Sequence, residues 1–169
     1  MTTKVWVGFS TTNKFMSRLI RWVTRGKSSH AWLRYYDETL QMHMVMQAEL
    51  EGYETIPWKR WLTKNKLIAA YEPTEVNLIG GLRYIAQYLG ADYDLKSALW
   101  VGLKRWFGKK MRRVFHSPRK LMCSEAVARA LQQADVQCVK DVDPELVSPA
   151  ELQAALAASS EFQRVEVEG

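Results

Sequence analysis

The chain has 169 residues, of which 47% are hydrophobic and 25% charged, and its formal net charge is +6. This length and composition predict one globular domain, residues 1–169, and exclude a wholly disordered chain. Two cysteines are too few for a disulfide framework, and no Cys/His spacing typical of a zinc site occurs. We therefore expect two reduced thiols, no metal and no other cofactor.

The pattern of apolar residues predicts mainly strands in the first half of the chain and mainly helices in the second, which indicates an α+β fold. Strands are expected over 4–10, 28–36, 40–50, 52–58, 66–73 and 162–168. Helices are expected over 13–26, 59–63, 75–89, 95–107, 121–131 and 148–156. Gly26 and Gly90 are the expected ends of two of these helices, and Ser148 with Glu151 forms the expected capping box of the last one.

The positive charge is concentrated in two parts of the chain. Residues 104–120 contain eight Lys or Arg and no acidic residue, and residues 1–36 contain seven and none. This asymmetry favours an anionic partner, either a membrane surface or an acidic polymer, and less readily nucleic acid. A solvated basic face without a partner is the alternative.

The candidate binding residues of the basic segment 104–120 are Lys104, Arg105, Lys109, Lys110, Arg112 and Arg113. Large apolar residues alternate with these charges: Trp106, Phe107, Met111, Val114 and Phe115. Such a pattern suits an interfacial helix or a surface on which nucleic-acid bases stack. We expect the segment to face solvent near the mouth of a cleft.

The length of the apolar runs and the pattern of the first residues indicate where the protein is made. Every apolar run is interrupted by charge before the roughly 20 residues that a membrane-spanning helix needs. The first residues alternate like a strand and lack the apolar core of a signal peptide. We expect cytoplasmic synthesis, with delivery by a virion or phage-type lysis machinery if the target lies in the cell envelope.

Cys123 lies at the start of a predicted helix, on the apolar stripe that continues through Val127 and Leu131. A thiol at this place either packs as a small hydrophobic group or reacts. The N–H groups and dipole of a helix N-terminus lower the pKa of a thiol from its ordinary value of about 8.5. A neighbouring imidazole completes the activation by taking the proton.

Three histidines are candidates for this partner. His116 lies in the basic connector, His43 lies within a strand, and His30 begins a strand directly after a polar loop. We prefer His30, because a sheet fixes a side chain at a strand start while that side chain still faces a cleft. Gln47, on the neighbouring strand, is expected to hold the second ring nitrogen. Spacing alone does not decide between a catalytic pair and two ordinary buried residues.

Five segments, in order, resemble the circularly permuted NlpC-type papain-like hydrolases, a YiiX-like group related to lecithin–retinol acyltransferase. They are residues 17–33, 45–62, 90–106, 121–131 and 143–156. In that family the strand with the histidine precedes the helix with the cysteine. The resemblance implies a small antiparallel sheet, or half-barrel, packed against helices, with the cysteine at the N-terminus of a late helix.

Carried over by position, the resemblance implies that Cys123 is the nucleophile, His30 the base and Gln47 the third polar residue. Many relatives have glutamate at this third position, and glutamine orients an imidazole without stabilising an imidazolium by charge. Glu49 is therefore a supporting candidate, and Gln47→Glu is expected to preserve or raise activity. Tyr93 is expected either to line the cleft or to belong to the core.

The resemblance implies a cysteine hydrolase that forms an acyl-enzyme, with cell-wall (peptidoglycan) peptides as the first substrate class and a setting in phage-associated lysis. Lipid esters and thioesters are the second class. The alternative is a non-catalytic protein on the same scaffold that binds an anionic surface through residues 104–120.

Overall fold

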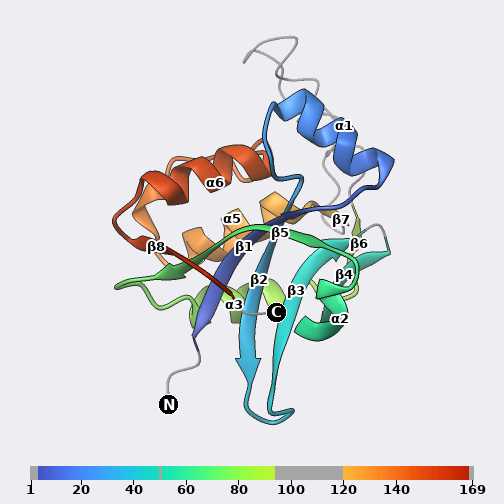
Figure 1. Ribbon diagram of the computed structural model, residues 1–169. Helices are drawn as coiled ribbons and strands as arrows, with labels where there is room; N and C mark the ends of the chain where they lie inside the picture. The colour runs from blue at the N-terminus through green and yellow to red at the C-terminus, as the bar shows by residue number, and fades with distance from the viewer. Residues whose placement is uncertain (1–3, 50, 94–119, 168–169) are drawn as a thin grey trace.

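A six-stranded antiparallel sheet forms the centre of the computed structural model, which describes residues 4–49, 51–93 and 120–167 (Figure 1). The strands lie in the order β4-β3-β2-β1-β5-β8. Their bounds are β1 Val5–Thr11, β2 His30–Asp37, β3 Met42–Glu49, β4 Gly52–Pro57, β5 Lys66–Pro73 and β8 Phe162–Val165. A separate parallel pair joins β6, Asp92–Tyr93, to β7, Lys120–Leu121.

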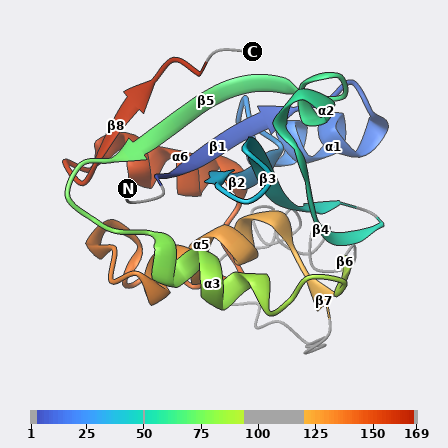
Figure 2. The same ribbon diagram turned by 90° about the horizontal axis from the view of Figure 1, so that it is seen from below.

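Helices cover both faces of this sheet. They are α1 Phe15–Thr24, α2 Trp58–Leu62, α3 Ile79–Ala86, α5 Cys123–Gln133, a 3₁₀ turn Gln137–Val139, and α6 Pro149–Ala158. Helices α3, α5 and α6 pack on one face, and α2 packs on the other (Figure 2). The protein is therefore a mixed α+β protein with an antiparallel sheet, as the sequence predicts. Among the described helices, none combines the length and the apolar character that crossing a membrane requires.

The alternation of side chains along β2 supplies both layers of the core. Ala31 and Leu33 point toward α5 and belong to the larger buried cluster, whereas Trp32 points the other way. Trp32 packs against Trp61 of α2, with ring centroids 4.7 Å apart. A Cβ at Gly8 would lie 2.1 Å from the Trp32 ring, so the neighbouring strand needs a glycine at this position.

Every described α-helix begins or ends a few residues away from its predicted bounds, and the differences at α1 and α3 have a visible cause. Helix α1 ends at Thr24, and Arg25 rather than Gly26 takes the left-handed conformation, with φ 52°. Gly26 is needed for packing, because a Cβ there would lie 2.3 Å from the Cβ of Ala150. Helix α3 begins at Ile79 rather than at 75, because the side chain of Asn77 accepts a hydrogen bond from the Ile79 N–H. The helix predicted over 95–107 lies outside the described residues.

Candidate active site

Cys123 and His30 meet at one end of the sheet, where α5 packs against β2. His30 is the first residue of β2 and Cys123 the first residue of α5. Their side chains interact directly, and each shifts the pKa of the other, although they lie far apart in the sequence. Only 3% of Cys123 and 8% of His30 is exposed. The structure thus brings together the thiol and the imidazole that the sequence proposes as a pair.

The surroundings of His30 favour its protonated form. Burial by itself lowers the pKa of an imidazole, because a charge is poorly solvated inside a protein. The hydrogen bond and charge of Cys123, the charge of Glu49 and the hydrogen bond to Gln47 outweigh this effect. Together they raise the pKa of His30 to about 9, so the ring is charged at neutral pH.

The pKa of Cys123 changes in the opposite direction from that of His30. Burial by itself raises the pKa of a thiol, but the hydrogen bond and charge of His30 lower it, as do the backbone groups of Ala31 and Ser124. The net result is a pKa below the ordinary value. The other cysteine, Cys138, has a raised pKa because it is half-buried without such a cation. Of the two thiols, only Cys123 has a lowered pKa, which is the property that a nucleophilic thiol requires.

Gln47 fixes the orientation of the imidazole, and its own orientation is fixed by two neighbours. The Trp61 Nε1–H donates to Gln47 Oε1 at 2.9 Å, and Gln47 Nε2 donates to Glu54 Oε1 at 3.0 Å. An indole N–H can only donate and an ionised carboxylate can only accept, so the two ends of the amide cannot be exchanged. Gln47 Oε1 lies 3.0 Å from His30 Nε2, which must therefore carry a proton. By elimination, Nδ1 is the ring nitrogen available to the thiol.

Glu49 supplies the charge that Gln47 lacks. Its Oε1 lies 3.9 Å from His30 Nε2, beyond hydrogen-bonding distance but close enough to favour the imidazolium. Glu49 lies two residues after Gln47 on β3, so both side chains reach the same face of the sheet. The supporting role that the sequence suggests for Glu49 is thus consistent with its position.

The bond between Gln47 and Glu54 changes one expectation drawn from the sequence. A glutamate at position 47 would place its carboxylate against that of Glu54, its partner on β4. Like charges at this distance repel, and one of the two carboxyl groups would have to take up a proton. We therefore expect Gln47→Glu to impair the site rather than improve it.

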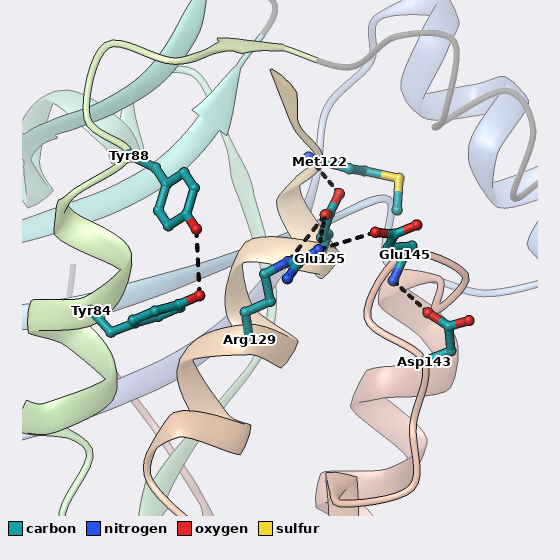
Figure 3. Close-up of polar contacts among 7 residues, drawn as sticks. All are labelled: Tyr84, Tyr88, Met122, Glu125, Arg129, Asp143 and Glu145. Carbon is teal, nitrogen blue, oxygen red and sulfur yellow. Dashed lines mark hydrogen bonds and ion pairs between the residues drawn. The ribbon is translucent and has the colours of Figure 1, made fainter. Parts of the chain in front are cut away.

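The residues that follow Cys123 hold the start of α5 in place. Ser124 Oγ donates to the Val147 carbonyl at 2.7 Å. Glu125 Oε2 accepts from the Met122 N–H at 3.5 Å, and Glu125 Oε1 accepts from Arg129 Nη2 at 2.9 Å (Figure 3). Serine and glutamate next to the thiol thus fix the helix terminus that carries Cys123.

Of the other residues singled out in the sequence, the structure describes His43 and the backbone of Tyr93. His43 lies on β3 between the rings of Trp6 and Tyr36, with centroids 5.6 and 5.1 Å away, and is not part of the site. The backbone of Tyr93 pairs with that of Leu121, two residues before the thiol. His116 and the candidate binding residues of the basic segment lie outside the described residues.

Two members of the site escaped the sequence analysis, namely Trp61 and Glu54. Trp61 lies on α2, and Glu54 faces Gln47 across the β3–β4 pair. The register of that pair places Glu54 opposite Gln47, and the register could have been proposed only once both strands and the turn between them had been fixed.

Comparison with known proteins supports the fold. No model of a known protein family matches the chain, and no curated protein matches it in sequence. Among solved structures, the chain is similar to the crystal structure of the metalloprotein YiiX from Escherichia coli O157:H7. The two are 16% identical, with a TM-score of 0.53 over 99% of this chain and 97% of that one. This likeness agrees with the YiiX-like part of the resemblance, whereas the relation to NlpC-type hydrolases and lecithin–retinol acyltransferase stays a prediction.

Proposed function

We propose that this protein is a cysteine hydrolase that cleaves amide bonds through an acyl-enzyme, on a permuted papain-like scaffold. The observation that carries the proposal is the meeting of the Cys123 thiol and the His30 imidazole, both buried, where α5 and β2 begin. Their interaction raises the pKa of His30 and lowers that of Cys123. A thiolate beside an imidazolium at neutral pH is the state from which cysteine hydrolases react. A cysteine and a histidine buried only for packing would not require a lowered thiol pKa or a raised imidazole pKa.

In the first half of the reaction, the Cys123 sulfur attacks the substrate carbonyl carbon. The carbonyl electrons move to oxygen, and a backbone N–H of the first turn of α5 stabilises the oxyanion. The tetrahedral intermediate collapses as the C–N bond breaks, and His30 Nδ1 gives its proton to the leaving nitrogen. An amine departs and a thioester to Cys123 remains.

In the second half, neutral His30 takes a proton from water, and the hydroxide attacks the thioester carbon. The C–S bond breaks, the acid leaves, and the thiolate–imidazolium pair is restored. Throughout both halves Gln47 keeps Nε2 protonated, so that Nδ1 is always the nitrogen that moves the proton. Glu49 stabilises the charged ring of the resting state.

A charged hollow beside the site favours peptides over lipid acyl chains as substrates. The hollow has a volume of about 110 Å³ and reaches Gln47 and Glu49. Most of its lining residues are charged, three of them acidic and three basic: Glu49, Glu51, Glu54, Lys14, Arg60 and Lys64. Such walls suit the charged side chains and termini of cell-wall peptides, whereas an acyl chain needs apolar walls.

The name of the similar structure raises the question of a metal. Within the described residues there is no group of three or more His, Cys, Asp or Glu side chains that could hold a metal ion. The possible metal ligands around the thiol are the His30 imidazole, the Gln47 amide and the more distant Glu49 carboxylate. This set suits a hydrolase of the papain kind better than a metal centre. No step of the proposed reaction therefore runs through a metal.

Hydrolysis by three variants tests the proposal. Purified protein is given peptidoglycan peptides and small soluble amide, ester and thioester substrates, and new amino groups or acids are measured. Cys123→Ser and His30→Ala should each lower kcat/KM by roughly 10²-fold or more, because the nucleophile or the proton carrier is lost. Cys138→Ser is the matched control and should leave the rate unchanged.

Two results would contradict the proposal. One is undiminished turnover by Cys123→Ser with the fold preserved by circular dichroism. The other is a loss with Cys138→Ser equal to that with Cys123→Ser, which would mean that the wrong thiol has been assigned. A rate on ester substrates far above that on amides would correct the substrate class and keep the mechanism.

A further inference from the structure

Helix α1 exposes a row of large apolar side chains. Phe15 is 76% exposed and Trp22 64%, more than any other large hydrophobic residue that the structure describes. Leu19 lies between them, partly exposed. The spacing i, i+4, i+7 places all three on one side of the helix. Large exposed apolar side chains in such a row are typical of an interaction surface.

Basic residues lie along one side of this apolar face. Lys14, Arg18, Arg21 and Arg25 lie on or beside α1, and residues 1–36 contain no acidic residue. No ion pair joins any of these cations to an acidic side chain in the part of the chain that the structure describes. The charges therefore add to one positive field around the apolar row.

A groove beside α1 continues the basic surface. It has a volume of about 540 Å³ and is lined by Arg21, Lys27 and Lys66 together with the ring of Trp22. None of the described residues that line it is acidic. Thr11 and Asn13 add polar groups to its wall. Three cations with polar neighbours around one open groove are groups of the kind that bind phosphate.

The apolar row and the groove lie at the same end of the molecule as the thiol. Helix α1 is the connection between β1 and β2, and β2 begins with His30. In Figure 1 α1 lies at the top, whereas the β2–β3 turn lies at the opposite end. A surface that binds α1 would therefore meet the end of the sheet that carries Cys123 and His30.

We propose that α1 docks this protein on an anionic phospholipid bilayer. Phe15, Leu19 and Trp22 enter the boundary between headgroups and acyl chains, and the flanking cations contact the anionic headgroups. The groove between α1 and β5 takes one headgroup phosphate. Charge complementarity identifies this occupant, and the apolar row distinguishes a bilayer from a purely acidic polymer, which has no apolar layer for it to enter.

Co-sedimentation with vesicles tests the proposal on the full chain, with Cys123→Ser present so that no substrate is consumed. Phosphatidylcholine vesicles with phosphatidylglycerol should bind the protein, and vesicles of phosphatidylcholine alone should bind it far more weakly. Binding should weaken steeply with salt, because the Debye length falls from about 10 Å at 0.1 M to about 3 Å at 1 M.

Paired variants test whether vesicle binding depends on α1 or on exposed apolar residues elsewhere. Phe15→Ser/Trp22→Ser should weaken binding by roughly tenfold or more, because two buried aromatic contacts are lost. The matched control Leu40→Ser/Met42→Ser changes two exposed apolar residues at the opposite end of the sheet and should have no effect.

The charges are tested by a second pair of variants. Arg18→Gln/Arg25→Gln should weaken binding by roughly tenfold or more. Arg83→Gln/Lys140→Gln removes the same charge from exposed positions away from α1 and should change binding by at most a few-fold.

Three results would overturn the proposal: equal binding to neutral and anionic vesicles, equal losses with each variant and its control, or no vesicle binding at all. Tighter binding to single-stranded DNA than to anionic vesicles would identify nucleic acid as the partner instead. Because binding is read from an inactive protein, a negative result here leaves the hydrolase proposal standing, and absent hydrolysis leaves this one standing.

Discussion

At the scale of single residues, the amide of Gln47 lies between the carboxylate of Glu54 and the imidazole of His30. Glu54 accepts from the amide nitrogen and His30 donates to the amide oxygen, so the amide dipole is aligned between a carboxylate and an imidazolium. Glutamine thus orients the ring here while a carboxylate lies behind it. Glu49 and Glu54 thus place negative charge near the imidazolium, which the neutral side chain of Gln47 cannot supply by itself.

Exchange of the two residues tests this arrangement. Gln47→Glu alone should lower kcat/KM on the order of tenfold, because its carboxylate repels that of Glu54. The double variant Gln47→Glu/Glu54→Gln should recover most of the loss, since the carboxylate at 47 then accepts from His30, Trp61 and the new amide. A double variant no better than the single one would contradict the assigned network.

Local signals in the sequence were enough to make Cys123, His30 and Gln47 candidates, because a thiol at a helix start and an imidazole at a strand start are recognisable. The choice of the catalytic pair and the addition of Glu49 depended on the resemblance to the permuted NlpC-type hydrolases. The partners of Gln47 were not accessible in this way. Whether glutamine at 47 helps or hinders depends on which side chain lies across the β3–β4 pair, and that follows from strand register rather than from any local pattern.

At the scale of elements, the contact between α3 and α5 supports the helix that carries the thiol. Gly81 lies where α3 crosses α5, and a Cβ there would be 2.0 Å from the Ala130 carbonyl oxygen. Gly80, its neighbour, has no atom within 4 Å of such a Cβ. The two glycines interrupt the helical pattern of the sequence equally, yet only one of them is required by packing.

Alanine substitutions at Gly80 and Gly81 test which of the two glycines the packing of α3 on α5 requires. Gly80→Ala should raise the free energy of unfolding by roughly 0.5–1 kcal/mol, because alanine loses less backbone entropy in a helix. Gly81→Ala should lower it by roughly 1–3 kcal/mol, because α3 must move away from α5. Denaturant unfolding measures both. Equal effects of the two substitutions would contradict the close crossing of the helices.

Most element types could be predicted, but several boundaries could not. The alternating strands and the capping box of α6 are local signals, and the structure confirms them: Ser148 accepts from the Glu151 N–H at 3.2 Å. The end of α1 lies beside a contact with a distant residue, since Gly26 packs against Ala150. The start of α3 coincides with a hydrogen bond to the side chain of Asn77, which the apolar pattern does not reveal. The two-residue pair β6–β7 is too short to leave any pattern.

At the scale of the whole molecule, the sheet brings distant segments to one end. β1 pairs with both β2 and β5, and β3 and β4 continue the sheet beyond β2. Because β2 and β3 are antiparallel, His30 at the start of β2 and Gln47 and Glu49 near the end of β3 lie at the same end of the sheet as α1. α5 then adds Cys123 from the second half of the chain. The role expected for the basic segment 104–120 stays a prediction, and the surface proposed here for binding anions rests on α1 instead.

The ionisation of Cys123 tests the central claim most directly. Thiolate absorbance in the ultraviolet, taken as the difference between the protein and its Cys123→Ser variant, is followed against pH. The thiolate should form with a midpoint below the ordinary value of about 8.5, and the charged pair should persist until His30 loses its proton at about pH 9. In His30→Ala the midpoint should rise above the ordinary value, because burial then acts on the thiol without a cation beside it. A midpoint at or above the ordinary value in the unaltered protein, or one that His30→Ala does not move, would contradict the account.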